Sequence, residues 1–246
     1  MMELPQEDRQ GSRERKQNSM KEWQEFIARV DVFFGLSAKE RETLLAGASK
    51  MDVKRRAALF SANTLANNLY VITRGTMKTV QGNSHDQQLL VDFLKPGEVL
   101  GEESVLLSGE HGVEAVSLES ASVLCFPADG VKKMLTSQPR LGHALAALAA
   151  SRARAYRERL YLMTATPVPV RLAQCLSMLV RRFGRRDKQG TMIALRITHQ
   201  DLADYVGASR ETVSLFLSRF RKDGLIVMNV RRIIVPDLKA LKKVTK

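Results

Sequence analysis

A segment near the C-terminus constrains the fold of this chain most strongly, because it carries the start and stop signals of two consecutive helices. Thr198 followed by Asp201 is close to a capping box, and predicts a helix that begins there and ends at Gly207. Ser209 is a second N-cap, and the helix that it starts ends at Gly224. Apolar residues on the two helices can face each other across the short glycine turn, which predicts a helix-turn-helix.

The second of these helices begins with polar side chains, at the end where a helix in the major groove of DNA reaches base edges. Arginine can pair with guanine and glutamate can accept a hydrogen bond from cytosine. The predicted base-reading residues are therefore Arg210, Glu211 and Ser214. After the helix, residues 225–235 (LIVMNVRRIIV) are typical of two short strands with a tight turn, which form a wing. The predicted contacts to the DNA backbone are Thr198, His199, Ser209, Thr212, Arg219, Arg231 and Arg232.

The positive charge of the chain is concentrated in the part that contains this motif. Residues 139–246 hold 22 Lys and Arg against 7 Asp and Glu, whereas residues 1–138 hold 17 against 19. The whole net charge of +13 therefore comes from the C-terminal part. A basic domain is typical of proteins that bind a polyanion, and we expect duplex DNA as the partner.

The N-terminal half has a different pattern. Between residues 53 and 126, short apolar runs alternate with turn residues such as Gly75 and Gly97, which is typical of an antiparallel barrel or sandwich. Residues 129–164 then show helical spacing over many turns. A helix of this length exceeds what a small barrel can bury, so we expect it to pair with its copy in a homodimer. The predicted dimer stripe consists of Leu141, Leu145, Leu148, Tyr156 and Leu160.

These patterns predict an α+β fold with an N-terminal antiparallel β-barrel of the jelly-roll kind, a long dimerisation helix and a C-terminal winged helix-turn-helix. The expected units are a disordered tail at 1–18, a sensory domain at 19–136, the dimerisation helix at 137–166 and the DNA-binding domain at 167–246. The sequence has no apolar run long enough to cross a membrane and no apolar signal core, so we expect a cytoplasmic protein without a membrane partner.

Two stretches of the chain resemble the family of the cyclic-AMP receptor protein and the fumarate-nitrate reduction regulator, the Crp/Fnr family of transcription regulators. They are Ile197–Ile226 (ITHQDLADYVGASRETVSLFLSRFRKDGLI) and Pro96–Glu102 (PGEVLGE). The resemblance covers roughly residues 25–240. It implies a homodimer that binds a palindromic promoter site, recruits RNA polymerase, and changes its DNA affinity when an effector binds the barrel.

The resemblance also implies functions for individual residues of this chain. Arg210 and Glu211 match the base-reading positions of the cyclic-AMP receptor branch, and Ser214 matches a serine that the other branch uses. The next position, usually arginine, is Leu215 here, which removes one expected guanine contact. The effector pocket that the resemblance implies is formed by Gly101, Glu102, Gly112, Val113, Tyr156 and Arg157.

This pocket departs from the cyclic-nucleotide binders of the family. Gly112 and Val113 stand where those proteins have the arginine and serine that hold the cyclic phosphate. The pair Tyr156-Arg157 replaces the Thr-Ser pair that contacts the base. A phosphate needs donors and positive charge, and the glutamates in residues 102–114 make this neighbourhood acidic. We therefore do not expect cyclic AMP to be the effector.

Other effectors stay open. The loop SGEHGVEA resembles the corresponding stretch of CO-sensing haem members, which makes haem, with CO or NO as the signal, an alternative. Leu107 occupies the position of their usual ligand histidine, and the nearest candidate ligand is His111. The chain has no N-terminal cysteine cluster, so no iron–sulfur cluster is expected. A thiol sensor at Cys125 and an unknown small molecule remain as further alternatives.

Two other classes of function compete with a DNA-binding regulator. The first is a cyclic-nucleotide-type regulatory module that acts on a protein partner, but such a module needs no helix-turn-helix. The second is an enzyme. The sequence shows no nucleophile–base pair, metal constellation or phosphate-binding glycine loop, so we expect no catalytic residues.

Overall fold

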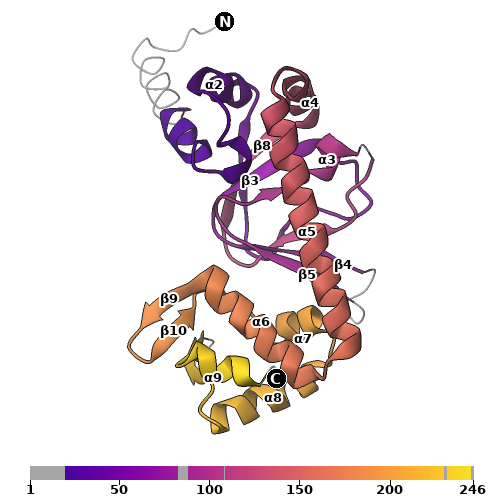
Figure 1. Cartoon of the computed structure of the whole chain (residues 1–246). Helices are drawn as coiled ribbons and strands as arrows, with labels where there is room; N and C mark the ends of the chain where they lie inside the picture. Colours follow the sequence, from indigo (N-terminus) through magenta and orange to yellow (C-terminus); the bar gives the residue numbers. More distant parts are fainter. Residues whose placement is uncertain (1–19, 83–87, 108, 230–231, 245–246) are drawn as a thin grey trace, which may run out of the picture.

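The computed structural model shows two domains joined by one long helix (Figure 1). The described residues are 20–82, 88–107, 109–229 and 232–244. The expected tail at 1–18 lies outside them. A strand-rich domain lies beside the N-terminal part of the long helix, and a second domain lies at its C-terminal end (Figure 1).

The strand-rich domain contains two four-stranded antiparallel sheets. The first has the order β1-β8-β3-β6, with strands at Ser49–Val53, Ala121–Pro127, Asn68–Arg74 and Val99–Leu100. The second has the order β2-β7-β4-β5, with strands at Ala58–Phe60, Glu114–Ser117, Met77–Gln81 and Leu89–Leu94. This arrangement confirms the jelly-roll prediction. It also corrects the expectation of a barrel, because no strand pairing within the described residues closes the two sheets into one.

Strand β3 shows why these apolar runs form strands that are buried on both faces. Successive side chains of a strand point to opposite sides of the sheet. Leu69 and Val71 therefore face the helices at the top of the domain, whereas Tyr70 and Ile72 face the space between the two sheets. Both sides need apolar residues, and the continuous run LYVI satisfies both.

Short helices flank the sheets. They are a helical segment at 20–27, η1 (Asp31–Phe33), α2 (Ala38–Ala46), α3 (Glu103–Leu106) and α4 (Ala128–Ser137). Helix α2 begins with a capping box, since Ser37 and Glu40 exchange side-chain to backbone hydrogen bonds. Among the described residues, no helix combines the length and the apolarity that crossing a membrane requires.

The long helix α5 (Pro139–Ala165) does not present the predicted dimer stripe to solvent. Leu141 and Leu145 are 1% and 0% exposed, because they pack into the chain's own core with the N-terminal helices and α4. Leu148 is half-buried against the same core. Leu160 is 63% exposed, as the dimer prediction requires, whereas Tyr156 is 39% exposed and lines a cavity of the strand-rich domain. Leu141 and Leu145, and in part Leu148, therefore belong to the internal packing of one protomer.

The C-terminal domain is a winged helix-turn-helix. Its helices are α6 (Val168–Phe183), α7 (His199–Val206), α8 (Arg210–Lys222) and α9 (Leu238–Lys243). Its sheet has the order β11-β12-β10-β9, with strands at Val227–Asn229, Arg232–Val235, Gly190–Ile193 and Gly184–Asp187. The helices enclose an apolar core whose centre is formed by Leu172, Leu176, Leu202, Val213 and Leu217.

The two domains also pack against each other. Phe93 on β5 belongs to the same apolar cluster as the residues of α6 and α7. Around it, Arg182 of α6 donates hydrogen bonds to Asp92 at 2.6 Å and to both carboxylate oxygens of Glu98 at 2.9 and 3.0 Å. On the other side, Lys78 of β4 pairs with Asp201 of α7 at 2.7 Å. The second sheet is therefore one wall of the domain interface.

Candidate nucleic-acid interface and internal cavity

The turn between α7 and α8 is built as the sequence predicts. Thr198 Oγ1 accepts a hydrogen bond from the Asp201 backbone N–H at 3.0 Å, and the Asp201 carboxylate accepts one from the Thr198 N–H at 2.8 Å. Gly207 then adopts a φ of 65°, which side chains with a Cβ rarely adopt. Ser209 Oγ accepts from the Thr212 N–H at 3.1 Å. These caps confirm the predicted helix-turn-helix and leave the first turn of α8 at the surface.

The predicted base-reading residues lie on this first turn. Arg210 and Glu211 are exposed, and neither makes a hydrogen bond or ion pair with another described residue. Ser214, one turn later, is half-buried, and its Oγ lies 2.8 Å from Nδ1 of His199 on α7. Two side chains are thus available to a ligand, whereas the third also ties the two helices together.

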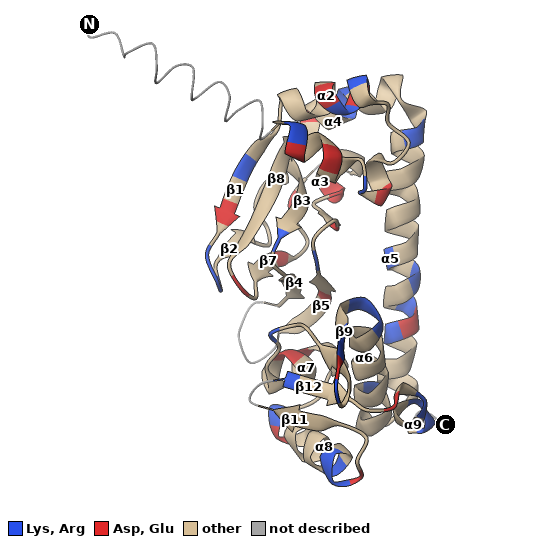
Figure 2. Cartoon of the chain, turned by 90° about the vertical axis from the view of Figure 1, so that its left-hand side faces the viewer, with Lys and Arg blue, Asp and Glu red and all other residues tan. Residues whose placement is uncertain are grey.

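The residues predicted to contact the DNA backbone fall into two groups. The polar residues are Thr198 and Ser209, which are the two N-caps, Thr212, whose N–H donates to Ser209, and His199, which contacts Ser214. The arginines differ, because Arg219 and Arg232 are exposed, and Arg231 lies outside the described residues. Ribbon segments coloured for Lys and Arg occur along α8 and around β9, so this end of the molecule is basic (Figure 2).

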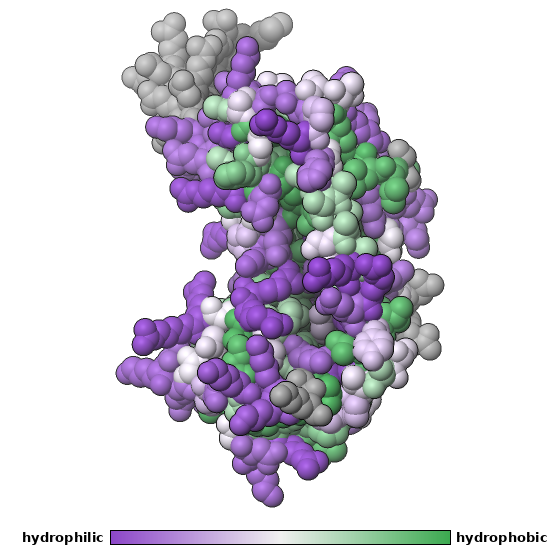
Figure 3. All heavy atoms as spheres, viewed as in Figure 1, coloured by the Kyte–Doolittle hydropathy of each residue, from purple (hydrophilic) through white to green (hydrophobic). Residues whose placement is uncertain are grey.

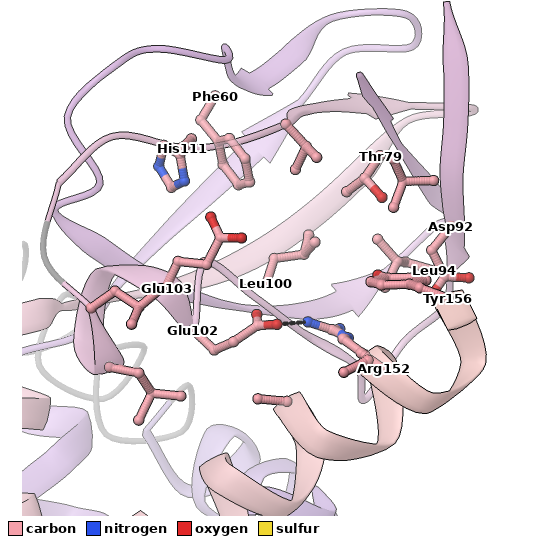
Figure 4. A pocket seen from close by; sticks show the side chains of 17 residues that line it. Phe60, Thr79, Asp92, Leu94, Leu100, Glu102, Glu103, His111, Arg152 and Tyr156 are labelled. Atoms are coloured by element: carbon pink, nitrogen blue, oxygen red, sulfur yellow. Dashed lines mark hydrogen bonds and ion pairs between the residues drawn. The ribbon is translucent and has the colours of Figure 1, made fainter. Parts of the chain in front are cut away.

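A cavity of about 320 Å³ lies in the strand-rich domain, between the second sheet, α3 and the middle of α5. We call it the sheet cavity. Its walls are mainly apolar, with Phe60, Leu94, Leu100 and Val113 among the lining residues. The polar side chains that face it come from four different elements and include Glu102, Glu103, His111 and Arg152 (Figure 4).

An ion pair between Glu102 and Arg152 crosses one side of this cavity (Figure 4). Arg152 comes from α5 and also donates to the Val99 carbonyl at 2.6 Å. Arg152 is not among the predicted pocket residues, although it lies four residues before Tyr156 and therefore on the same face of the helix. Among the described residues that line the cavity, it carries the one positive charge, and Glu102 neutralises that charge.

His111 forms the opposite wall. Its imidazole is 2% exposed and stacks on Phe60, with 3.7 Å between ring centroids and an angle of 13°. Burial lowers the pKa of His111, and this outweighs the opposing effect of Glu103, so the ring is neutral at pH 7. No cluster of three or more His, Cys, Asp or Glu side chains in the described part of the chain is placed to hold a metal ion.

The structure brings together most, but not all, of the predicted pocket residues. Gly101, Glu102, Val113 and Tyr156 line the cavity, but Gly112 and Arg157 do not. Arg157 is exposed because one residue step turns a helix by about 100°, which carries its side chain away from the face of Tyr156. The Gly112 N–H instead donates to Glu103 at 3.3 Å. Gly101 requires glycine, since its φ is +74° and a Cβ would lie 2.6 Å from the Asn68 carbonyl.

Two family models match this chain. The model of the Crp-like helix-turn-helix domain matches residues 170–244, and the model of the cyclic nucleotide-binding domain matches residues 50–138. The first covers α6 to α9, and the second covers the two sheets with α3 and α4. The matches agree with the two regions in which the interface and the sheet cavity lie.

Curated relatives and solved structures match most of the length of this chain. The chain is 25% identical over 217 residues to a CRP-like cAMP-activated global transcriptional regulator of Mycobacterium tuberculosis, covering 88% of this chain and 97% of that protein. It is 28% identical over 218 residues to the transcriptional regulatory protein btr of Bordetella pertussis, covering 88% and 90%. FixK2 of Bradyrhizobium japonicum has the same fold, with a TM-score of 0.73, 22% identity and coverage of 81% of this chain and 98% of that one. The relatives are regulators, which confirms the prediction that the chain is not an enzyme.

Proposed function

Since the chain belongs to the Crp/Fnr family of transcription regulators, we propose that it binds a palindromic promoter site as a homodimer and that an effector in the sheet cavity controls its DNA affinity. The observation that carries the DNA-binding proposal is the first turn of α8. Arg210 and Glu211 are exposed there, and neither has a described partner for which DNA would have to compete. RNA polymerase is the further partner that membership of the family implies.

Base recognition follows from these side chains. An arginine at the start of a helix in the major groove can donate two hydrogen bonds to guanine, and a neighbouring glutamate can accept one from cytosine. Leu215, on the next turn, is 66% exposed and apolar, which suits the methyl group of thymine. The exposed Arg219 and Arg232 suit phosphate oxygens.

The test begins with selection of bound duplexes from a random pool, followed by fluorescence anisotropy on the selected site. Arg210→Ala is expected to weaken binding to that site about 10- to 100-fold, because a bidentate base contact contributes about 1–3 kcal/mol. Arg29→Ala is the matched control, since Arg29 is an exposed arginine in the other domain. Equal affinities of wild type and Arg210→Ala for the selected site would refute the proposal.

The dimer contact is placed on the outer face of α5. Ala146, Ala150, Ala153, Arg157 and Leu160 recur at helical spacing and are all exposed. Hydrophobic and weakly hydrophobic residues lie at the surface over the upper part of this helix (Figure 3). Small alanines allow a second α5 to approach closely, and Leu160 supplies apolar area at the lower end. Sedimentation of Ala150→Glu as a monomer, beside a dimeric wild type, is the expected result, since Ala150 is exposed and does not line the sheet cavity.

The effector proposal excludes cyclic AMP, on the basis of charge. Asp92, Glu102 and Glu103 face the sheet cavity against the single positive charge of Arg152, which Glu102 already neutralises. A cyclic phosphate would enter this acidic space without a free cation to receive it. A neutral, mainly apolar molecule fits these walls. Calorimetric titration with cyclic AMP is expected to show no binding, and a dissociation constant in the micromolar range would refute this part.

Haem is the second candidate, and His111 favours it. Its buried, neutral imidazole is the form that binds iron, and the remaining walls are largely apolar. When bound, haem would supply an iron that takes up CO or NO. Arg152 is the lining residue that could hold a propionate, although it would first have to release Glu102. A Soret band in protein made with haem precursor, lost in His111→Ala and kept in His143→Ala, would support haem; a colourless protein would refute it.

A further inference from the structure

The lower end of α5 meets α6 at the junction between the two domains (Figure 1). A second hollow is lined by residues of these two helices. We call it the junction pocket. It has a volume of about 560 Å³, which is within the range of small-molecule sites. Its walls come from the C-terminal part of α5, from α6 and α7, and from Lys242 on α9. It shares no lining residue with the sheet cavity.

The junction pocket is rich in positive charge. Arg159, Arg171 and Arg181 all line it, and none forms an ion pair with a carboxylate within the described residues. Arg159 donates to the Val91 carbonyl and lies over the Tyr205 ring, with 4.4 Å from its Cζ to the ring centroid. Arg171 donates to four backbone carbonyls at the C-terminal ends of α5 and α7, so its donors are already occupied. The lining carboxylate is Glu158, and its described partner is Arg154, outside the pocket.

Arg181 is the cation most available to a ligand. Its side chain is exposed, and no hydrogen bond or ion pair joins it to another described residue. A guanidinium group in this state presents its N–H donors in a planar fork that matches a carboxylate, sulfonate or phosphate.

Two buried polar atoms in the same pocket have no partner in the described part of the protein. They are Oε1 of Gln174 and Oγ of Ser177. Ser177 is 3% exposed. Buried polar atoms are nearly always hydrogen-bonded, so these two point to a molecule that reaches them from the pocket. They lie on α6, as Arg181 does, and Ser177 is one turn before that arginine.

The remaining walls are apolar and adaptable. Leu162, Met163 and Met178 line the pocket, and methionine side chains adjust readily to the shape of a ligand. Cys175 contributes an uncharged thiol, because burial raises its pKa to about 12 although Arg159 opposes that rise. The pocket therefore combines a cationic rim with an apolar floor.

One wall of this pocket lies away from the proposed dimer face, although Met163, which also lines it, is about one turn after Leu160. The proposed dimer face of α5 contains Leu160, whereas the pocket is lined by Leu162. Two residues turn a helix by about 200°, so these side chains lie on opposite faces. Leu160 is exposed, in agreement with this geometry.

We propose that the junction pocket binds a small organic anion, with its acidic group against Arg181 and Arg159, a polar group at Ser177 and Gln174, and its apolar body against Leu162 and the methionines. The site does not depend on DNA binding, since none of these residues is among those predicted to contact DNA. The anion would touch α5 and α6 together and would hold the two domains in the arrangement seen here.

The test uses the full-length protein and the fluorescent probe 8-anilinonaphthalene-1-sulfonate, which joins a sulfonate to an apolar ring system. Arg181→Glu is expected to weaken probe binding about tenfold or more, because it reverses the charge that receives the sulfonate. Ser177→Leu is expected to weaken it similarly, because the larger side chain occupies the pocket. Arg181 is exposed, so its substitution should not disturb the core, and its variant tests the proposal even if Ser177→Leu does not fold.

Two control variants complete the design. Arg185→Glu makes the same charge change on β9, outside the pocket, and is expected to bind the probe as the wild type does. Tyr156→Ala alters the sheet cavity and is also expected to leave probe binding unchanged. The proposal is overturned if Arg181→Glu binds as tightly as the wild type, if Arg185→Glu loses as much, or if Tyr156→Ala abolishes binding.

Discussion

The two domains differ in where their functional charged side chains lie. In the C-terminal domain, the important side chains stand on the outside, at the start of one helix, and Arg210 and Glu211 have no described partner. In the strand-rich domain, they point inward, and Glu102 and Arg152 neutralise each other inside the sheet cavity. An exposed charge is ready to meet a large polyanion, whereas an enclosed and neutralised pair suits a small molecule with little charge.

Because the two sites lie in different domains, a ligand in the sheet cavity can affect DNA binding only through contacts between the domains. Asp92 faces the sheet cavity on one side and pairs with Arg182 of α6 on the other. The same arginine also holds Glu98, in the turn between β5 and β6. A ligand that displaces Asp92 would therefore act directly on the position of the DNA-binding domain.

The largest effect on stability is expected from Arg182→Ala, which removes the ion pairs between α6 and the strand-rich domain. It leaves two partly buried carboxylates, Asp92 and Glu98, without their cation, and we expect unfolding to cost about 3 kcal/mol less. Guanidinium denaturation followed by circular dichroism would measure this. The control is Arg154→Ala, which removes an exposed ion pair with Glu158 and should change stability by less than about 1 kcal/mol. Equal stabilities of the two variants would show that the ion pairs of Arg182 contribute no more than an exposed pair.

A change of DNA specificity is the next largest effect. Leu215→Arg adds a guanidinium group to the exposed face of α8, and we expect guanine to be favoured by about 1–2 kcal/mol at the base pair which Leu215 faces. Selection of duplexes from a random pool, repeated with the variant, would reveal the new preference. Leu65→Arg is the control, because Leu65 is an equally exposed leucine in the other domain. An unchanged consensus would show that α8 does not present this residue to bases.

The smallest effect concerns pH and the interior of the strand-rich domain. Burial lowers the pKa of His111 below its usual 6.5, against the opposing charge of Glu103, so the unfolded chain takes up a proton more readily than the folded one. The contribution of the neutral His111 ring to the free energy of unfolding is therefore full above pH 6.5. It declines as the pH falls below 6.5, because the unfolded chain then binds a proton that the folded protein does not. We expect denaturant unfolding between pH 5 and 8 to show this decline, and His111→Gln to reduce it. An identical pH profile for the variant would refute the assignment to His111.

Local signals in the sequence predicted the C-terminal domain well. A cap and the residue it bonds lie three positions apart, so Thr198 with Asp201 and Ser209 with Thr212 could be recognised without knowledge of the fold. The glycine at 207 was predictable for the same reason, since its left-handed backbone is a property of one residue.

The strand-rich domain was predicted less completely, because its key contacts join distant parts of the chain. Helical spacing placed Leu141 and Leu145 on a stripe but could not say which surface the stripe meets, and the structure buries both in their own protomer. The partner of Glu102 is 50 residues away on α5, and no local pattern indicates such a pair.

The sequence by itself determined the type and order of the elements, the helix-turn-helix and the side chains at its tip, because caps, turns and periodicity act over a few residues. Tertiary structure alone decided which face of α5 stays free, which charges meet in the sheet cavity, and how Arg182 joins the two domains. Those outcomes depend on the packing of two sheets against one helix and one domain against another, and their energies arise only when distant segments meet.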